Sequence, residues 1–220
     1  VARMLPFGDD ARERCLEDDL GLGHRLAIDA DTFAQSFEQA LDARGVPHAR
    51  LPAEVGPAAL EGASWVICPN SGPVKSAFRD RLAAAREAGA RLTMGPLARG
   101  LDERLRPVAD EVVAALGAEI VDKIDPASAD AAVARAIEKL DLPSYACDPD
   151  TVHAAVHVDD TQTPRVVFII NGGANDVSAR VAIGVDAQWE DAMDDSRTRS
   201  EAGVLEVHLR ARSARMLIRS

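Results

Sequence analysis

Ala63-Ser-Trp-Val-Ile-Cys-Pro-Asn-Ser-Gly-Pro-Val-Lys75 is the stretch of the chain that decides the fold. Its apolar run, Trp65–Cys68, stops at Pro69-Asn-Ser-Gly72, and a helical pattern begins near Pro73. This order of strand, sharp turn and helix is typical of an α/β protein. In open α/β sheets, ligands bind at the carboxyl ends of the strands. The turn Asn70–Gly72 is therefore the first place to look for a site.

The same alternation of strand and helix extends to both sides of this stretch. We expect strands at residues 25–28, 46–51, 65–68, 90–94 and 118–121. Helices are expected between them, from about residue 32 to Gly45 and at residues 74–88, 107–116 and 128–140. Because helices join successive strands, the sheet is predicted to be parallel. Pro47 places the second strand at an edge of the sheet or at its own start.

The two ends of the chain differ from this pattern. Residues 1–23 are rich in charge and are interpreted as a connecting arm outside the core. Beyond Pro149 the helical periodicity fades, and short strands are expected at residues 152–158, 165–170, 177–183, 203–209 and 214–218. Short strands at this spacing predict a small antiparallel β-sandwich. With about 70 residues, such a domain buries little surface by itself and is expected to dock on another part of the protein.

Composition excludes several classes of partner. The 220 residues carry a net charge of −11, which repels nucleic acid and anionic membranes. No apolar run approaches the ~20 residues of a membrane span, and the charged residues 1–23 do not resemble a signal peptide. Aromatic residues make up 4% of the chain, so the core is expected to be aliphatic. The chain begins with Val, which fits a piece of a longer protein.

The cysteines point to a reducing compartment. Cys15, Cys68 and Cys147 are far apart and odd in number, which does not fit a disulfide framework. We therefore expect a cytoplasmic protein. No Cys-x-x-Cys pair is present, so a structural zinc site is not expected.

Two side chains near the opening turn are candidate nucleophiles. Cys68 is the last residue of an apolar strand, a position more typical of a core thiol. Ser71 lies in the turn itself but lacks the Gly-x-Ser-x-Gly frame of a nucleophile elbow. No histidine follows His48 in the α/β part of the chain, so a general base would have to come from elsewhere.

Candidate phosphate and metal sites are weak. Gly95-Pro-Leu-Ala-Arg-Gly100 follows a strand, but Pro96 removes an amide donor that a phosphate cradle uses. His153 and His157 lie about 13 Å apart on a strand at ~3.3 Å per residue, and are interpreted as a solvent-facing stripe. Four aspartates lack the spacing of a calcium loop and are interpreted as turn residues: Asp148, Asp150, Asp159 and Asp160. No spacing singles out a pair of carboxylates, and we expect no catalytic, cofactor-binding or metal-binding residue in this chain.

Several segments, taken in order, resemble the C-terminal portion of bacterial β-galactosidases of glycoside hydrolase families 42 and 35. Trp65-Val-Ile-Cys-Pro-Asn70 is similar to the strand that precedes a Pro-Asn turn in that family, and Glu87–Pro96 is similar to its helix end, glycine, strand and Gly-Pro stop. Arg165–Asn171 and Leu205–Ile218 resemble the terminal sandwich. The resemblance covers about residues 24 to 220.

The resemblance implies a domain organisation. Residues 24–145 would form a flavodoxin-like domain that is similar to class I glutamine amidotransferases and is known as the trimerisation domain. Residues 146–220 would form the closing β-sandwich. The amidotransferase nucleophile follows the strand that matches Leu92–Met94, where this chain has Gly95-Pro-Leu97 and no thiol. The glycosidase carboxylates belong to a (β/α)8 barrel of about 250 residues, for which this chain has no room.

The leading hypothesis is therefore a non-catalytic accessory region of a β-galactosidase-type glycoside hydrolase. It would support a homotrimer and dock on the catalytic barrel, which hydrolyses terminal β-galactosides with two carboxylates. One alternative is an independent flavodoxin-like module that binds a small ligand at Asn70–Gly72. Another is a self-contained hydrolase that uses Ser71 or Cys68. Exposure of Trp65 or Trp189 would indicate a contact surface.

Overall fold

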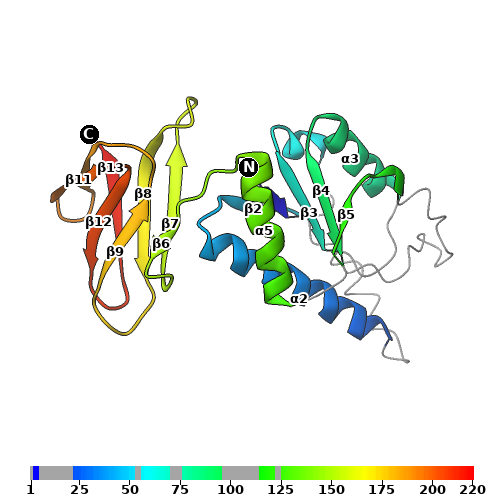
Figure 1. Ribbon diagram of the computed structural model, residues 1–220, viewed down its shortest axis with the longest axis horizontal. Coiled ribbons are helices and arrows are strands. Elements are labelled where there is room, and N and C mark those ends of the chain that lie inside the picture. The colour runs from blue at the N-terminus through cyan, green and yellow to red at the C-terminus, as the bar shows by residue number, and fades with distance from the viewer. Residues whose placement is uncertain (1, 5–21, 53–55, 70–75, 96–113, 122–124) are drawn as a thin grey trace. The chain divides into compact units, whose positions relative to one another are not determined.

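The computed structural model describes residues 2–4, 22–52, 56–69, 76–95, 114–121 and 125–220 (Figure 1). The chain forms two compact units. The first, the α/β unit, comprises Val1–Ala40 and His48–Leu142. The second, the sandwich unit, comprises Leu41–Pro47 and Pro143–Ser220. Among the described residues, no helix combines the length and the apolar character needed to cross a membrane.

The α/β unit is built on a parallel sheet with the strand order β2-β1-β3-β4-β5. Every neighbouring pair runs parallel, as the alternation of strand and helix predicts. β2 lies at an edge of the sheet, as expected from Pro47. The strands are β1 (Ala2–Met4), β2 (His48–Arg50), β3 (Trp65–Pro69), β4 (Arg91–Gly95) and β5 (Glu119–Ile120).

Helices cover both faces of this sheet (Figure 1). On one face, α3 (Ser76–Glu87) buries Phe78, Leu82 and Ala85 against residues of β3 and β4. On the other face, Phe37 of α2 (Leu22–Ala43) meets the Trp65 ring edge-on at 6.1 Å. α5 (Pro126–Leu140) buries one small-residue face, and the Asp125 carboxylate caps it by accepting a hydrogen bond from the Ser128 amide at 2.9 Å.

Two sequence predictions in this unit are wrong. Residues 25–28, predicted as the first strand, lie within α2. No Gly or Pro occurs between residues 24 and 44, so the helix continues through this short apolar run. The first strand is instead Ala2–Met4, inside the predicted arm at residues 1–23. β1 pairs with both β2 and β3, and the Met4 side chain is fully buried, so this part of the arm belongs to the core.

The strands predicted at 46–51, 65–68, 90–94 and 118–121 and the helices predicted at 74–88 and 128–140 are confirmed with small changes of boundary, and the helix predicted from about residue 32 begins ten residues earlier, at Leu22. A short 3-10 helix, η1 (Pro57–Leu60), lies between β2 and β3. Gly45, Gly89 and Gly117 all adopt positive φ just after helical segments, where glycine is favoured. The predicted helix at residues 107–116 lies mostly outside the described residues; within it, Ala114 and Ala115 are helical.

The sandwich unit contains an antiparallel arrangement of eight strands in the order β6-β9-β12-β11-β10-β13-β8-β7. β11 pairs with both β12 and β10, so it joins two halves. The first half holds β6 (Cys147–Asp148), β9 (Val177–Ala182), β12 (Val204–Leu209) and β11 (Arg197–Glu201). The second half holds β10 (Gln188–Asp191), β13 (Ser213–Arg219), β8 (Pro164–Asn171) and β7 (Val152–Val158).

One hydrophobic cluster fills the space between the two halves. Val167 and Ile169 of β8 meet Val181 of β9 and Leu205 of β12 in this cluster, and all four side chains are fully buried. Burying a side chain of this size contributes about 1.5–3 kcal/mol. The predicted antiparallel, sandwich-like architecture is therefore confirmed. β6, β10 and β11 are additional strands that the sequence analysis did not predict.

A backbone contact fixes the point where the chain enters the sandwich unit. The Tyr145 amide donates to the Gly45 carbonyl at 2.8 Å, and the Ser144 hydroxyl donates to the Arg44 carbonyl at 2.6 Å. A Cβ atom on Gly45 would collide with the Tyr145 carbonyl group. Gly45 is thus required both for its positive φ of 61° and for this close approach.

Candidate functional site

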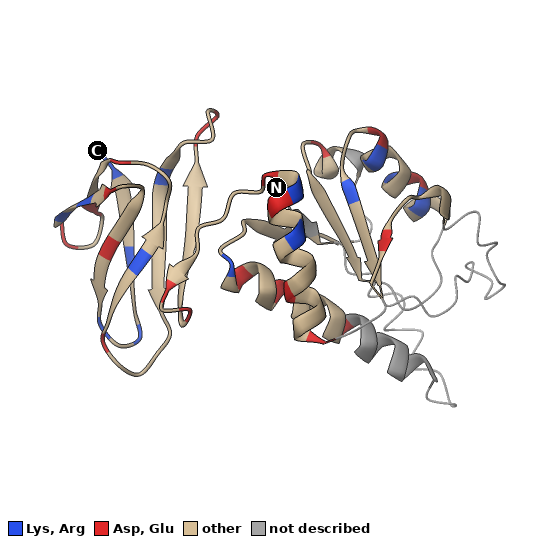
Figure 2. Ribbon diagram, viewed as in Figure 1, with Lys and Arg blue, Asp and Glu red and all other residues tan. Residues whose placement is uncertain are grey.

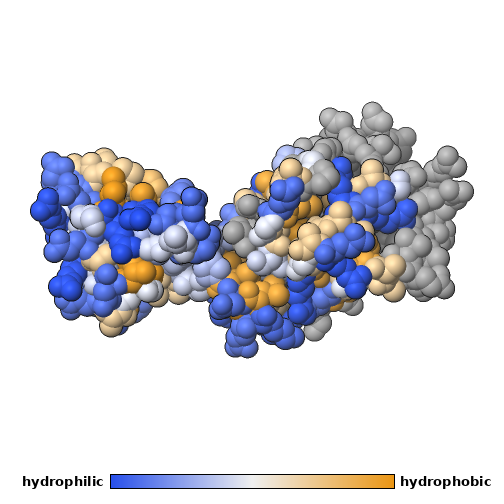
Figure 3. All heavy atoms as spheres, turned by 90° about the horizontal axis from the view of Figure 1, so that it is seen from above, coloured by the Kyte–Doolittle hydropathy of each residue, from blue (hydrophilic) through white to orange (hydrophobic). Residues whose placement is uncertain are grey.

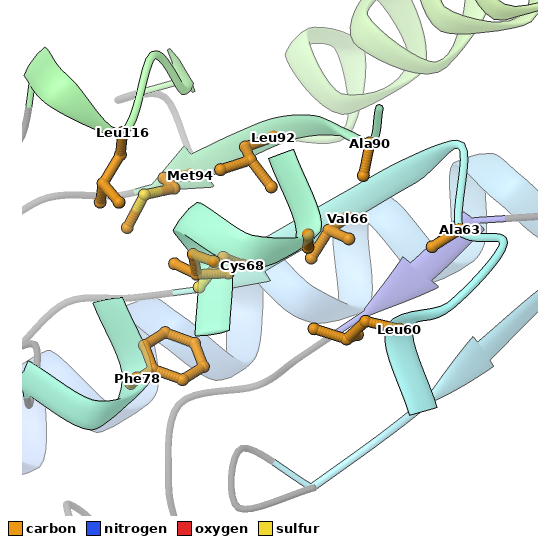
Figure 4. Packing of buried hydrophobic residues seen from close by; sticks show 11 residues of the cluster. Leu60, Ala63, Val66, Cys68, Phe78, Ala90, Leu92, Met94 and Leu116 are labelled. Atoms are coloured by element: carbon orange, nitrogen blue, oxygen red, sulfur yellow. The ribbon is translucent and has the colours of Figure 1, made fainter. Parts of the chain in front are cut away.

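The carboxyl edge of the parallel sheet is the place where the sequence predicted a site. All five residues of β3 are buried. Cys68 belongs to a buried hydrophobic cluster that also contains Phe78, Leu82 and Met94, and Figure 4 shows this cluster from close by. Burial raises the pKa of the Cys68 thiol, so the thiol stays neutral and unreactive. Cys68 is therefore a core residue. Ser71 and the rest of the turn Asn70–Gly72 lie outside the described residues.

Gly95 begins the segment that was considered as a phosphate loop, Gly95–Gly100. A Cβ atom at Gly95 would collide with the Val121 carbonyl and the Phe33 ring. The Val121 amide donates to the Met94 carbonyl at 2.9 Å, which holds these two segments of the chain together. Gly95 is thus a close-packing position, and the remaining residues of the segment lie outside the described part of the chain.

A charged cluster lies at the opposite, amino end of the strands. Glu119 accepts hydrogen bonds from Arg91 at 3.0 Å and from Arg135 at 3.3 Å. Partial burial by itself would raise the pKa of Glu119, but the bonds from Arg91 and Arg135 outweigh it and hold that pKa below its ordinary value. These ion pairs join β4, β5 and α5 on a partly exposed surface, where such pairs contribute little to stability.

Two hollows adjoin this cluster. One, of about 10 Å³ beside Trp65 and Thr93, has room for one water molecule at most. The other, of about 380 Å³, is an open groove lined by Arg86, Arg91 and Glu119. Arg86 donates to the Ala115 carbonyl at 2.7 Å and fits against Gly117, so its charge is already engaged by the protein. The partners in this cluster are distant in sequence, and no local pattern could have predicted them.

The two histidines of β7 lie where the sequence predicted them. His153 and His157 are exposed on the same face of the strand. The His157 ring contacts Phe168 of β8 edge-on, with 5.5 Å between the ring centroids. In the described part of the chain, no three His, Cys, Asp or Glu side chains gather in a way that could hold a metal ion.

The four aspartates considered for calcium have separate structural roles. Asp159 organises the turn between β7 and β8, because its carboxylate accepts hydrogen bonds from Thr161, Thr163 and Arg165. Asp150 and Asp160 lie in turns, as predicted. Asp148 is different, since it ends strand β6 and pairs with Arg180 of β9.

The outer face of the second half of the sandwich is unusually apolar. We name it the outer apolar face. It consists of three outward residues from each of three neighbouring strands: His153, Ala155 and His157 of β7, Val166, Phe168 and Ile170 of β8, and Ala214, Met216 and Ile218 of β13. Ile170 and Ile218 are 48% and 43% exposed. Figure 2 shows β7 without a single charged residue, and Figure 3 shows hydrophobic areas between hydrophilic ones on the surface of the sandwich unit.

No protein-family model and no curated protein sequence matches the chain. Solved structures do match it. Gan42B, a GH42 β-galactosidase from G. stearothermophilus, aligns with 100% of this chain at a TM-score of 0.73 and 12% identity. The β-galactosidase from Bacillus circulans sp. alkalophilus aligns with 100% at 0.69 and 13% identity, and the cold-adapted β-galactosidase from Rahnella sp. R3 with 98% at 0.67 and 13% identity.

The chain has the fold of part of a GH42 β-galactosidase. It spans 40%, 41% and 40% of the lengths of these three structures. At these identities the similarity establishes the shared fold. This shared fold agrees with the resemblance to glycoside hydrolase family 42 that the sequence analysis stated.

Proposed function

We propose that the chain is a non-catalytic accessory region of a β-galactosidase-type glycoside hydrolase. It helps to assemble a homotrimer and docks on a catalytic (β/α)8 barrel that lies outside these 220 residues. The observation that carries the proposal is the alignment of the entire chain with 40% of the length of Gan42B at a TM-score of 0.73. The described chemistry agrees with it, because Cys68 is a buried core thiol and the β7 histidines are separate, exposed side chains.

Within this proposal, residues 24–145 form the flavodoxin-like, amidotransferase-like trimerisation domain, and strand β1 lies in the sheet of that domain. The strand order β2-β1-β3-β4-β5 supports this assignment, since 2-1-3-4-5 is the order of flavodoxin-like sheets. The connection between β2 and β3 departs from that pattern, because η1 is the helical element described there. Residues 146–220 are proposed as the closing sandwich domain.

The compartment proposed is the cytoplasm. Cys68 and Cys147 are both free thiols, and burial raises the pKa of Cys147 to about 11. Thiols that are partly or fully buried and protonated fit a reducing compartment.

The reading frame upstream of Val1 tests the proposal most directly. We expect it to encode a (β/α)8 barrel with two carboxylates placed for retaining hydrolysis. The full-length product is expected to hydrolyse a chromogenic aryl β-galactoside, and the 220-residue chain alone is not. An upstream start codon without a barrel, or hydrolysis by the 220-residue chain, would overturn the proposal.

The proposed homotrimer is tested separately. Size-exclusion chromatography with light scattering is expected to give three times the protomer mass for the full-length product. A monomer at high protein concentration would contradict the trimer while leaving the accessory role of the chain intact.

A further inference from the structure

The outer apolar face is continuous across three strands. Phe168 of β8 is opposite Ala155 of β7 and Met216 of β13, and Ile170 is opposite His153 and Ala214. Directly opposed side chains in neighbouring strands lie within contact distance. The nine side chains therefore form one block, in which no Asp, Glu, Lys or Arg occurs. At its β13 side, the block is bounded by the ion pair between Glu190 and Arg197 at 3.0 Å.

The other outer face of the same unit provides a comparison. On β9 and β12, four of the six outward residues are polar or charged, the other two being Ala182 and Val204, and Arg180 and Glu206 form an ion pair at 3.1 Å. His208 and Ser178 are exposed beside them. One face of the sandwich unit therefore carries the charges expected in water, whereas the other carries Val, Phe, Ile and Met. Contiguous exposed apolar patches of a few hundred Å² often mark contact surfaces, and the outer apolar face is the apolar side of this unit.

The size of the face limits what can cover it. Strands lie ~4.8 Å apart and outward residues ~6.7 Å apart along a strand, so nine residues cover ~290 Å². A complex of separate molecules needs about 800 Å² on each side, which excludes a stable dimer through this face alone. Contacts between domains of one chain begin at about 600 Å² in total, or ~300 Å² on each side. Covalent linkage makes such a small contact effective, because it raises the local concentration of the partner.

We infer that the outer apolar face is the docking surface for another part of the same polypeptide, beyond these 220 residues, which presents an apolar patch of similar size. This inference rests on the proposed function. The lengths of the solved structures agree with it, because this fold occupies 40% of chains that continue beyond it. The occupant packs on Phe168, Ile170, Met216 and Ile218, while His153 and His157 form a polar rim.

Two matched cysteine variants test the inference. Ala155→Cys places a thiol in the middle of the outer apolar face, and Ala182→Cys places one on the polar face of β9; both alanines are exposed. Each variant is made in the 220-residue chain and in the full-length product. Labelling with a maleimide is followed by peptide mass spectrometry, which separates the new thiol from the native cysteines.

In the 220-residue chain, both thiols are expected to react at similar rates. In the full-length product, Cys at position 155 is expected to react at least tenfold more slowly, and Cys at position 182 at an unchanged rate. Adding Ile170→Glu to Ala155→Cys is expected to restore fast labelling in the full-length product. Because Ile170 is 48% exposed in this chain, the substitution leaves the 220-residue chain folded, which its thermal transition verifies.

Equal labelling of position 155 in both forms would overturn the inference. Slow maleimide labelling of position 155 in the 220-residue chain that becomes fast on dilution would also overturn the inference, because the face would then be covered by a second copy of the chain. Hydrolysis of the aryl β-galactoside by the full-length product reports separately on the proposed function. A hydrolase whose position 155 is unprotected keeps the proposed function and refutes only the docking surface.

Discussion

Each of the two tryptophans forms the same kind of buried pair. The Trp65 indole N–H donates to the Thr93 hydroxyl at 2.9 Å, and that of Trp189 to the Ser200 hydroxyl at 3.0 Å. Both rings are buried, with 1% and 0% exposure, so neither is a contact surface. A buried indole needs an acceptor for its N–H. The sequence could not identify that acceptor, since it lies 28 residues away in one pair and 11 in the other.

Ser200→Ala is expected to destabilise the sandwich unit by about 1–3 kcal/mol. The Ser200 hydroxyl accepts from the Trp189 indole and from the Ala187 amide at 2.9 Å, and it donates to the Val185 carbonyl at 2.7 Å. Alanine leaves these groups unsatisfied in a fully buried position. Urea titration measures the change. Ser178→Ala, at an exposed position of β9, is the control and is expected to change stability by less than about 0.5 kcal/mol. Equal losses of unfolding free energy for the two substitutions would contradict the stabilising role of the Ser200 hydrogen bonds.

Asp159 is expected to make the sandwich unit sensitive to acid. Hydrogen bonds from the Thr161 hydroxyl, the Thr163 amide and the Arg165 side chain hold the pKa of Asp159 well below its ordinary value. A depressed folded-state pKa stabilises the fold above the unfolded-state pKa of about 3.9, and this stabilisation is lost as pH falls below it. The urea midpoints of wild type and Asp159→Asn should therefore differ at pH 7, and the difference should shrink progressively as pH falls below about 4.

The neighbouring exposed carboxylate supplies the control for that experiment. Asp160→Asn removes the same charge from the same turn without touching the hydrogen bonds of Asp159. A difference in urea midpoint between wild type and Asp159→Asn that stays constant down to pH 2 would refute the role of the Asp159 carboxylate.

At the scale of elements, strong local patterns were sufficient for prediction and weak ones were not. β3, α3 and β4 follow from an apolar run, a helical face and clear Gly and Pro stops, and all three are confirmed. β1 has three residues, too few for any periodicity. β11 reads Arg-Thr-Arg-Ser-Glu and has no apolar residue, so only its pairing with β10 and β12 makes it a strand. The predicted site at Asn70–Gly72 stays a prediction, because it lies outside the described residues.

β8 shows a different limit of sequence patterns. Val166–Ile170 is apolar throughout, a run that is typical of a buried strand. In the structure, Val167 and Ile169 are fully buried, whereas Ile170 is 48% exposed. An unbroken apolar run does not reveal which face lies inward or whether the second face is covered. For that reason the outer apolar face could not be predicted from the sequence.

Ile169 and Ile170 provide a matched pair of substitutions for the sidedness of β8. Ile169→Ala is expected to cost about 2–5 kcal/mol of unfolding free energy, because it leaves a cavity in the sandwich core. Ile170→Ala, in the 220-residue chain, is expected to cost less than about 1 kcal/mol, since its side chain borders solvent. Urea titration of the two variants measures both values. A larger loss at Ile170 than at Ile169 would mean that the register of β8 against β13 is wrong.

At the scale of the whole molecule, each unit closes a hydrophobic core of its own. The cluster around Leu82 draws on β3, β4 and α3, and the cluster around Ile169 draws on both halves of the sandwich; they share no residue. The resemblance found in the sequence anticipated two such parts in this order. It could not supply the contacts inside them, since these depend on pairings between distant residues such as Arg91 and Glu119.

The two tryptophans, one in each unit, allow the units to be followed separately during unfolding. Trp65→Phe leaves Trp189 as the only indole and a reporter of the sandwich unit, and Trp189→Phe leaves Trp65 as a reporter of the α/β unit. Because the cores are separate, Ile169→Ala is expected to lower the urea midpoint reported by Trp189 and to leave that reported by Trp65 nearly unchanged. Leu82→Ala is expected to do the reverse. Tryptophan fluorescence during urea titration of the four double variants measures all four midpoints. If either core substitution lowers the urea midpoints reported by Trp65 and Trp189 equally, the chain unfolds as one cooperative unit.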